Sequence, residues 1–275
     1  MIQKQQLLNL VVAHKLEAKP LIAMLGMERI HSVSTYPLFQ NQQGVSLIIA
    51  GMGKLAANDA VACMAKLQDS DSSLKSAWLN IGIAGHQSAA VGSGLLAHKI
   101  TDGVSGDSFY PPQLLSGLKT SDIITVDEPE FSYPEDAAYE MEAFGFYAAA
   151  TQLATAELVQ VYKIVSDNPS NPATDIDRGQ IANWIDAQSD AIHKLVQHLS
   201  DLVNEVNRVY GHPQQVAQLC ARFSLTVTQR TQLIRLCQRY HALGQGARLQ
   251  LLADRGASSA KQLINGLAEN LADFH

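Results

Sequence analysis

Three acidic residues of this sequence each belong to an apolar run: Glu17, Glu142 and Asp167. The runs are VVAHKLEA, YEMEAFG and VYKIVSDNP, and each is typical of a buried strand that ends close to the acid. Ligands of open α/β sheets bind at the carboxyl ends of the strands, so we expect the three carboxyl groups there. Arg29 is the only arginine before Arg178. The pattern indicates a site that works with carboxylates and water rather than with bound phosphate.

Glycines follow two further apolar runs. Gly51 and Gly53 lie in GMGK, and Gly82 and Gly85 lie in NIGIAGHQS. A glycine at such a turn lets the backbone approach a ligand closely, and the start of the helix that follows favours anions. GMGK is neither a Walker loop nor a full GxGxxG, so a tight turn between a strand and a helix is an equally good interpretation.

Each acid also has a purely structural interpretation. Glu140 and Glu142 are two residues apart and point the same way in a strand, unless a helix begins at Ala143. A carboxylate near the start of a helix is favourable in itself, which applies to both Glu142 and Glu17. Asp167 is followed by Asn and Pro and fits a turn equally well. The local sequence leaves both interpretations open.

Composition narrows the class of protein. The chain has 275 residues, of which 47% are hydrophobic, and it contains no apolar run of the roughly 18 residues that span a bilayer. Its first residues lack a small-residue cleavage signal, so we expect a first strand there and a cytoplasmic protein. Cys63, Cys220 and Cys237 are too few and too scattered for a disulfide framework. No His or Cys cluster has the spacing of metal ligands.

Strand-like and helical patterns alternate from Leu7 to about Asp167. SAWLNIGIAG, DIITV and LVQVYKIVS are apolar on both faces, as the central strands of a covered sheet are. The alternation predicts a three-layer α/β fold, an αβα sandwich. Residues 105–122 and Phe131–Pro134 are predicted as loops, the first of them functional. Residues 178–205 have helical spacing and are predicted as one closing helix on the sheet.

The chain changes in kind after this helix. Residues 1–205 are the expected catalytic domain, and residues 206–275 are an all-helical appendage. Three helices are predicted in the appendage, HPQQVAQLCARF, TVTQRTQLIRLCQRYHALG and ASSAKQLINGLAENLADF. Their expected N-caps are Thr226 or Thr228 and Ser258 or Ser259, and their expected stops are Gly244 and Gly256.

Charge divides unevenly along the chain. Residues 1–177 carry 10 basic and 19 acidic residues, a net charge of −9, while residues 178–275 carry 10 and 7, a net charge of +3. The basic excess is spread out rather than clustered in a stripe. It therefore excludes a typical nucleic-acid interface but leaves an acidic protein partner open.

In order and spacing, residues 7–205 resemble the nucleoside phosphorylase superfamily. They are most similar to its hydrolytic branch, the 5′-methylthioadenosine/S-adenosylhomocysteine nucleosidases and the futalosine hydrolases. The pieces that carry the resemblance are Ala13–Glu17, GMGK, NIGIAG at 80–85, YPEDAAYEMEA at 133–143 and the strand that ends in Ser166 and Asp167.

The resemblance implies roles for individual residues. Glu17 matches the acid that activates the attacking water, and Asp167 matches the acid that protonates N7 of the purine. Met141 and Glu142 match the residues that line and hold the ribose, with Glu142 on its hydroxyls. Main-chain groups are implied at the purine edge, and the matching positions are Ile83, Ala84, Gly85, Val165 and Ser166. The candidates for the aromatic contact with the base are Tyr110, Phe131 and Tyr133.

The implied reaction is hydrolysis of the N-glycosidic bond of a purine nucleoside of the methylthioadenosine, adenosylhomocysteine or futalosine type. Breaking this bond develops positive charge on the ribose, which carboxylates stabilise, while an acid neutralises the departing base. The resemblance implies no metal and no organic cofactor. It also implies a homodimer, and no membrane partner is expected.

Two alternatives to hydrolysis remain open. One is a phosphate-dependent phosphorylase, in which phosphate would need cations such as Lys15, Lys54 and His86. The other is a catalytically weak nucleoside-binding or scaffold protein whose helical tail docks a protein partner. The arginines that such a tail would offer are Arg222, Arg230, Arg235 and Arg239.

Overall fold

The computed structural model describes residues 7–30, 35–67, 75–175, 178–210 and 214–272. The chain forms two compact units, which are Met1–Ser70 with Ser76–Val203 and Asp71–Lys75 with Asn204–His275. We call them unit 1 and unit 2. In the described ranges, no helix has both the length and the apolar character that crossing a membrane requires.

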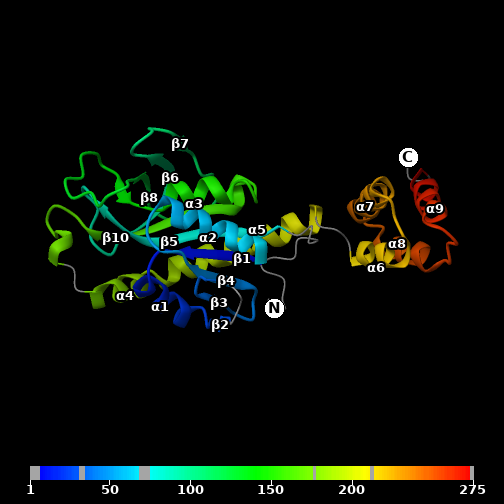
Figure 1. Ribbon diagram of the computed structural model, residues 1–275, viewed down its shortest axis with the longest axis horizontal. Coiled ribbons are helices and arrows are strands. Elements are labelled where there is room, and N and C mark those ends of the chain that lie inside the picture. Colours follow the sequence, from blue (N-terminus) through cyan, green and yellow to red (C-terminus); the bar gives the residue numbers. More distant parts are fainter. Residues whose placement is uncertain (1–6, 31–34, 68–74, 176–177, 211–213, 273–275) are drawn as a thin grey trace. The chain divides into compact units, whose positions relative to one another are not determined.

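Unit 1 is built on one mixed sheet of ten strands (Figure 1). The strands are β1 (Leu8–Val12), β2 (Glu28–Ile30), β3 (Leu38–Gln40), β4 (Val45–Ile49), β5 (Ala77–His86), β6 (Gly94–Asp102), β7 (Ser108–Phe109), β8 (Thr120–Thr125), β9 (Ala138–Glu140) and β10 (Val159–Asp167). Their order in the sheet is β10-β6-β8-β9-β5-β1-β4-β3-β2, and β7 pairs with β6.

Five strands of this sheet close into a ring, because β10 pairs with β5 as well as with β6. The ring runs from β5 through β9, β8, β6 and β10 back to β5. From β5 the sheet continues as an open sheet through β1, β4, β3 and β2. β4, β1, β5 and β10 run parallel to one another, so their carboxyl ends meet at one edge. β1 and β10 are buried along their whole length.

Helices cover both faces of the sheet, which confirms the predicted α/β class (Figure 1). On one face α1 (Lys15–Met24) packs against α4 (Arg178–Ala187), and on the other α2 (Lys54–Leu67) packs against α3 (Ala143–Ala150). Two short 3-10 helices complete the unit, η1 (Ala156–Leu158) and η2 (Ala173–Asp175).

The prediction of one helix over residues 178–205 was wrong, because the segment forms two. The break between α4 and α5 (Ser189–Tyr210) lies at Gln188. The side chain of Gln188 turns inward there, where its Nε2 donates to the carbonyl of Gly92 at 2.7 Å and its Oε1 accepts from the hydroxyl of Tyr162 at 2.8 Å. The apolar spacing continues across the break, so periodicity alone does not reveal it.

The segment predicted as a functional loop at residues 105–122 contains the short strand β7. β7 pairs with β6 and brings Phe109 onto α3. The ring centroid of Phe109 lies 4.9 Å from that of Phe144 and 5.2 Å from that of Tyr147. The first aromatic residue of this segment therefore packs against α3.

The described part of unit 2 after residue 213 contains four helices where three were predicted. They are α6 (Gln214–Arg222), α7 (Val227–Ala242), α8 (Gly246–Asp254) and α9 (Ala260–Ala272). The helix that the sequence analysis missed is α8, which fills the interval between the two expected stops. Thr226 is the N-cap of α7, and its hydroxyl accepts from the N–H of Gln229. The helices bury a hydrophobic core of their own, which includes Leu233, Tyr240 and Leu267.

Gly145 sets how closely α2 and α3 approach. A Cβ atom at Gly145 would overlap the backbone carbonyl of Lys54. We expect Gly145→Ala to lower the free energy of unfolding by on the order of 1–3 kcal/mol, measured by urea denaturation, because the backbone must shift. Gly266→Ala is the matched control, since a Cβ atom there meets nothing within 4 Å in a helix. That variant should be neutral or slightly stabilising. Equal stability of both variants would contradict the prediction.

Candidate active site

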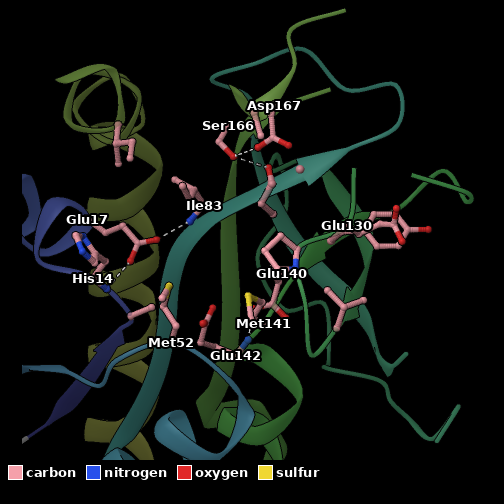
Figure 2. A pocket seen from close by; sticks show the side chains of 18 of the residues that line it. His14, Glu17, Met52, Ile83, Glu130, Glu140, Met141, Glu142, Ser166 and Asp167 are labelled. Carbon is pink, nitrogen blue, oxygen red and sulfur yellow. Dashed lines mark hydrogen bonds between the residues drawn. The ribbon is translucent and has the colours of Figure 1, made fainter. Parts of the chain in front are cut away.

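A cavity of about 310 Å³ opens where β1, β5 and β10 end (Figure 2). Ligand pockets in proteins typically measure roughly 300–1,000 Å³. The structure brings Glu17, Glu142 and Asp167 together here, although they lie far apart in the sequence. Their side chains reach the cavity from three directions (Figure 2). The lining residues are Ala13, His14, Leu16, Glu17, Met52, Ile83, Ala84, Gly85, Val126, Pro129, Glu130, Phe131, Tyr139, Glu140, Met141, Glu142, Ser166, Asp167, Ala173 and Ile181.

Glu17 is held by backbone groups from two elements. It lies in the first turn of α1, where one carboxylate oxygen accepts from the N–H of the N-cap residue His14 at 2.9 Å. The other oxygen accepts from the N–H of Ile83 in β5 at 3.0 Å. Burial raises the pKa of Glu17, and Lys163 and these hydrogen bonds oppose the shift. Glu17 therefore lies at the start of a helix and also lines the cavity.

The two carboxylates of EMEA, those of Glu140 and Glu142, have different hydrogen-bond partners. Glu140 accepts hydrogen bonds from Thr125 and from the backbone N–H groups of Glu142 and Ala143, so it anchors the start of α3. Glu142 is the N-cap residue of α3 and makes no capping bond with its side chain. Its Oε1 instead accepts from the N–H of Gly53 in the GMGK turn at 2.8 Å.

A buried lysine, which the sequence analysis did not single out, lies beneath these acids. Lys163 in β10 is 1% exposed, and its Nζ lies 2.7 Å from Oε2 of Glu140 and 3.9 Å from Oε2 of Glu142. Burial lowers the pKa of Lys163, but the negative charges of Glu140, Glu142 and Glu17 outweigh it and raise the pKa. The sequence did hold a signal for Lys163, since it lies in the middle of a strand predicted to be buried. A buried lysine is almost always paired with an acid, so an acidic partner could have been expected.

Together these groups form a buried cluster with more negative than positive charge. Burial, together with the charges of Glu140 and Glu17, raises the pKa of Glu142 to about 7, and Lys163 limits the shift. Glu142 therefore binds a proton more readily than an ordinary glutamate does.

Asp167 reaches the cavity through an irregularity in β10. The register between β10 and β5 shifts between Val165 and Asp167, which places Asp167 beside Gly85. A Cβ atom at Gly85 would lie 2.6 Å from Oδ2 of Asp167, so only glycine leaves room for this carboxyl group. The hydroxyl of Ser166 donates to Oδ1 of Asp167, and the hydroxyl of Tyr133 donates to Oδ2. Bulges commonly re-aim a side chain beside an active site.

The main-chain groups predicted at the purine edge are only partly accessible. Ile83, Ala84, Gly85 and Ser166 line the cavity. Val165 does not, because its N–H donates to the carbonyl of Ser93 at 2.9 Å and its carbonyl accepts from the N–H of Gly92 at 2.7 Å.

The three aromatic candidates take different places. Phe131 lines the cavity and is 63% exposed. Tyr110 is 69% exposed and is not among the described lining residues. Tyr133 is buried behind the cavity wall, where its φ of 46° is unusual for a residue other than glycine and costs on the order of 1–3 kcal/mol. Tyr139 lines the cavity but was not predicted.

The cations suggested for phosphate binding point elsewhere. Lys54 pairs with Asp102 at 2.8 Å and with Asp127 at 2.9 Å. His86 is buried, and its Nδ1 accepts from the N–H groups of Ser88 and Ala89, each at 3.0 Å. Lys15 is exposed on α1. Among the described residues that line the cavity, there is no lysine and no arginine. Within the same described ranges, no group of His, Cys, Asp and Glu side chains is arranged to hold a metal ion.

Removal of the buried cation tests the energetics of this cluster. Lys163→Met should lower the free energy of unfolding by about 3–5 kcal/mol, because it leaves buried carboxylates without a counter-charge. Lys99→Met is the matched control on the neighbouring strand β6, where the pair with Asp122 is about one-third exposed on both sides. It should cost about 1 kcal/mol or less. Comparable losses in urea denaturation would contradict the prediction.

The raised pKa of Glu142 predicts a pH dependence of stability. Glutamate titrates near 4.5 in the unfolded chain and near 7 at Glu142. Between these values the folded protein holds a proton that the unfolded chain lacks, so the free energy of unfolding contributed by Glu142 falls as pH rises from about 4.5 to about 7. Glu142→Gln should flatten the pH dependence in this window, measured by urea denaturation. Glu28→Gln, at an exposed position of β2, should keep the wild-type slope. An unchanged slope in Glu142→Gln would refute the assignment.

Comparisons with known proteins place the fold. No protein-family model matches the sequence, and no curated protein is significantly similar to it. Among solved structures, a 5′-methylthioadenosine/S-adenosylhomocysteine nucleosidase from Helicobacter pylori superposes with a TM-score of 0.57 at 13% identity, over 71% of this chain and 100% of that one. The 5′-methylthioadenosine nucleosidase of Arabidopsis thaliana gives 0.58 at 15% identity, over 71% and 97%.

A futalosine hydrolase from Helicobacter pylori is similar to the same extent. Its TM-score is 0.56 at 14% identity, and the match covers 70% of this chain and 98% of that one. The solved proteins are thus matched over almost their entire length. At these low identities the similarity concerns the fold, and this chain has the nucleoside phosphorylase-type fold that its sequence predicted.

Proposed function

We propose that unit 1 hydrolyses the N-glycosidic bond of a purine nucleoside. The observation that carries the proposal is the convergence of Glu17, Glu142 and Asp167 on one cavity whose described lining contains no lysine or arginine. The shared fold with solved nucleosidases supports the reaction class. Fold alone does not assign an activity, so the weight of the proposal rests on the arrangement of the acids.

Glu17 serves as the base that activates water. Both of its carboxylate oxygens are fixed by backbone N–H groups, and each oxygen keeps a further lone pair for the water. Burial moves the pKa of Glu17 upward, toward the pH at which the protein works, and a general base is most effective there. The backbone bonds also hold the carboxylate in place while the water loses its proton.

Glu142 binds the ribose hydroxyls. Its Oε1 is tied to Gly53, and its Oε2 faces Lys163 at 3.9 Å, a distance that leaves this oxygen free to accept from a diol. Met141 lines the cavity beside it and offers an apolar contact to the sugar. As the bond breaks, positive charge develops on the ribose, and the negative charge of the cluster stabilises it.

Asp167 donates a proton to the departing base at N7. It stands at the end of β10 and reaches the cavity from another side than Glu17 (Figure 2). This arrangement lets water attack one face of the sugar while the base leaves from the other. Ile83, Ala84, Gly85 and Ser166 line the wall between the two acids and are the groups assigned to the base, with Phe131 as its aromatic contact.

The charge of the cavity favours water over phosphate as the attacking group. Five carboxyl-bearing residues line it, namely Glu17, Glu130, Glu140, Glu142 and Asp167. Those of the five that are ionised would repel a phosphate dianion, which would also meet no lysine or arginine among the described lining residues. The same charge disfavours a 5′-phosphate on the substrate. The substrates assigned are therefore nucleosides of the methylthioadenosine, adenosylhomocysteine or futalosine type rather than nucleotides.

Chromatography of the products tests the proposal. Purified protein is mixed with methylthioadenosine, adenosylhomocysteine, adenosine, inosine, futalosine and AMP, each with and without phosphate. We expect free base from at least one nucleoside without phosphate, and none from AMP. Release that depends on phosphate would identify a phosphorylase, and no release from any compound would refute the proposal.

Substitution of the acid then tests the mechanism. Asp167→Asn should lower kcat by roughly a hundredfold or more, the usual size of general acid catalysis, while the ligand still binds. Asp59→Asn, at an exposed position of α2, is the matched control and should turn over normally. Near-normal turnover in Asp167→Asn would remove Asp167 from the reaction.

A further inference from the structure

Tyr133 is bonded to the carboxyl group that the proposed reaction uses as its acid. Its hydroxyl donates to Oδ2 of Asp167, while Ser166 donates to Oδ1, so each carboxyl oxygen has one hydroxyl donor. Tyr133 is 2% exposed and lies outside the described lining of the cavity. A buried tyrosine that touches an acid from behind the wall is placed to act on that acid rather than on a ligand.

The surrounding chain is arranged to hold Tyr133 in this position. A Cβ atom at Gly85 would lie 2.5 Å from Cε1 of Tyr133, so the ring fills the space that this glycine leaves. The ring also packs at a tilt against Tyr139, with centroids 6.0 Å apart. Glu130 fixes the turn before it by accepting from the backbone N–H and the hydroxyl of Ser132, each at 2.6 Å.

The position of Tyr133 requires an unfavourable backbone conformation. Its φ of 46° is the only positive value at a non-glycine residue in the described chain. Residues held in such a conformation persist only where their surroundings enforce it, and they gather at functional sites. A tyrosine that served only to fill space would not require its hydroxyl to meet the one acid at the end of β10.

We propose that Tyr133 is the positioning residue of Asp167: its hydroxyl orients the carboxyl group and stabilises the carboxylate that remains once the proton has left. The inference rests on the proposed nucleosidase function. In that step the O–H bond of Asp167 breaks and its proton goes to N7 of the base, while the electron pair of the broken C1′–N9 bond passes into the base. The water that Glu17 deprotonates forms the new bond to C1′. The carboxylate that is left accepts one hydrogen bond from Tyr133 and one from Ser166.

Tyr133 itself keeps its proton throughout. Burial, the hydrogen bond to Asp167 and the negative charges of Asp167 and Glu130 raise the pKa of Tyr133 well above its usual range. It is therefore a donor at every pH at which the protein works and does not serve as the acid. A hydrogen bond to a charged acceptor is stronger than one to a neutral acceptor, so the contact favours the carboxylate.

Tyr133→Phe tests the inference, because it keeps the ring and removes only the hydroxyl. Without this donor Asp167 becomes a weaker acid. We expect kcat to fall about tenfold or more, KM to change little, and the high-pH limb of the kcat profile to move to higher pH by about one unit. A purely structural role would lower stability without moving this limb. An unmoved limb would overturn the inference.

Tyr162→Phe is the matched control. Tyr162 is buried like Tyr133 and lies on β10, the strand that carries Asp167, but its hydroxyl donates to Gln188 at 2.8 Å rather than to an acid of the cavity. This variant should keep the wild-type pH profile. A shift of the same size in Tyr162→Phe would show that loss of any buried hydroxyl moves the limb, and would overturn the inference.

A titration that needs no turnover separates this inference from the proposed function. Carbon-13 NMR of the aspartate carboxyl groups, assigned with Asp167→Asn, should show Asp167 titrating at higher pH in Tyr133→Phe than in the wild type. If the protein releases no base but this shift occurs, the proposed function fails and the action of Tyr133 on Asp167 stands. If base is released and Asp167 titrates unchanged, the inference fails and the function stands.

A second variant keeps the test decisive if Tyr133→Phe does not fold. 3-Fluorotyrosine placed at position 133 retains the ring and the hydroxyl but makes the hydroxyl a stronger donor. The titration of Asp167 and the high-pH limb should then both move to lower pH, the opposite sign to the phenylalanine variant. No movement, or movement to higher pH, would overturn the inference.

Discussion

The arrangement of acids around the cavity depends on one buried positive charge, that of Lys163. An unpaired ammonium group inside a protein is costly, so Lys163 requires carboxylates close to it. Glu140 satisfies it directly and at the same time anchors the start of α3. Glu142 and Glu17 stand farther away and retain the capacity to bind something else. The ion cluster thereby ties β10, α3 and α1 together and leaves negative charge directed at the cavity.

Two glycines of β5 show where sequence reasoning was sound and where it was incomplete. The sequence predicted that Gly82 and Gly85 allow a close approach, and they do, but what approaches is protein. A Cβ atom at Gly82 would lie 3.0 Å from Oε1 of Glu17, and one at Gly85 would lie 2.6 Å from Oδ2 of Asp167. Each glycine makes room for an acid. The strand-end rule predicted that the three acids lie close together because parallel strands share an edge, whatever occupies the turns.

The features that the sequence did not reveal depend on partners distant in the chain. Gln188 interrupts a helix whose apolar spacing is continuous, and only Gly92 and Tyr162 explain the break. Lys163 is intelligible only beside Glu140, which is fixed by another strand. Tyr133 looked like a stacking residue because aromatic chemistry was all that its sequence displayed. Its actual partner, Asp167, lies 34 positions later. Periodicity and capping residues reveal only local structure. The roles of Gln188, Lys163 and Tyr133 depend on tertiary contacts, which local patterns do not show.

The closed ring of strands has a consequence for how the protein acquires its shape. β5 and β10 are adjacent in the ring but are separated by residues 87–158, so the contact that completes the cavity joins distant parts of the chain. Such non-local pairings are slow to form, and until then β5 exposes an unpaired edge that other chains can join. During synthesis the ring can close only after β10 has emerged, and residues 168–275 are made after it. The nascent chain therefore has an interval in which to complete the ring while it is still tethered to the ribosome and kept apart from its copies.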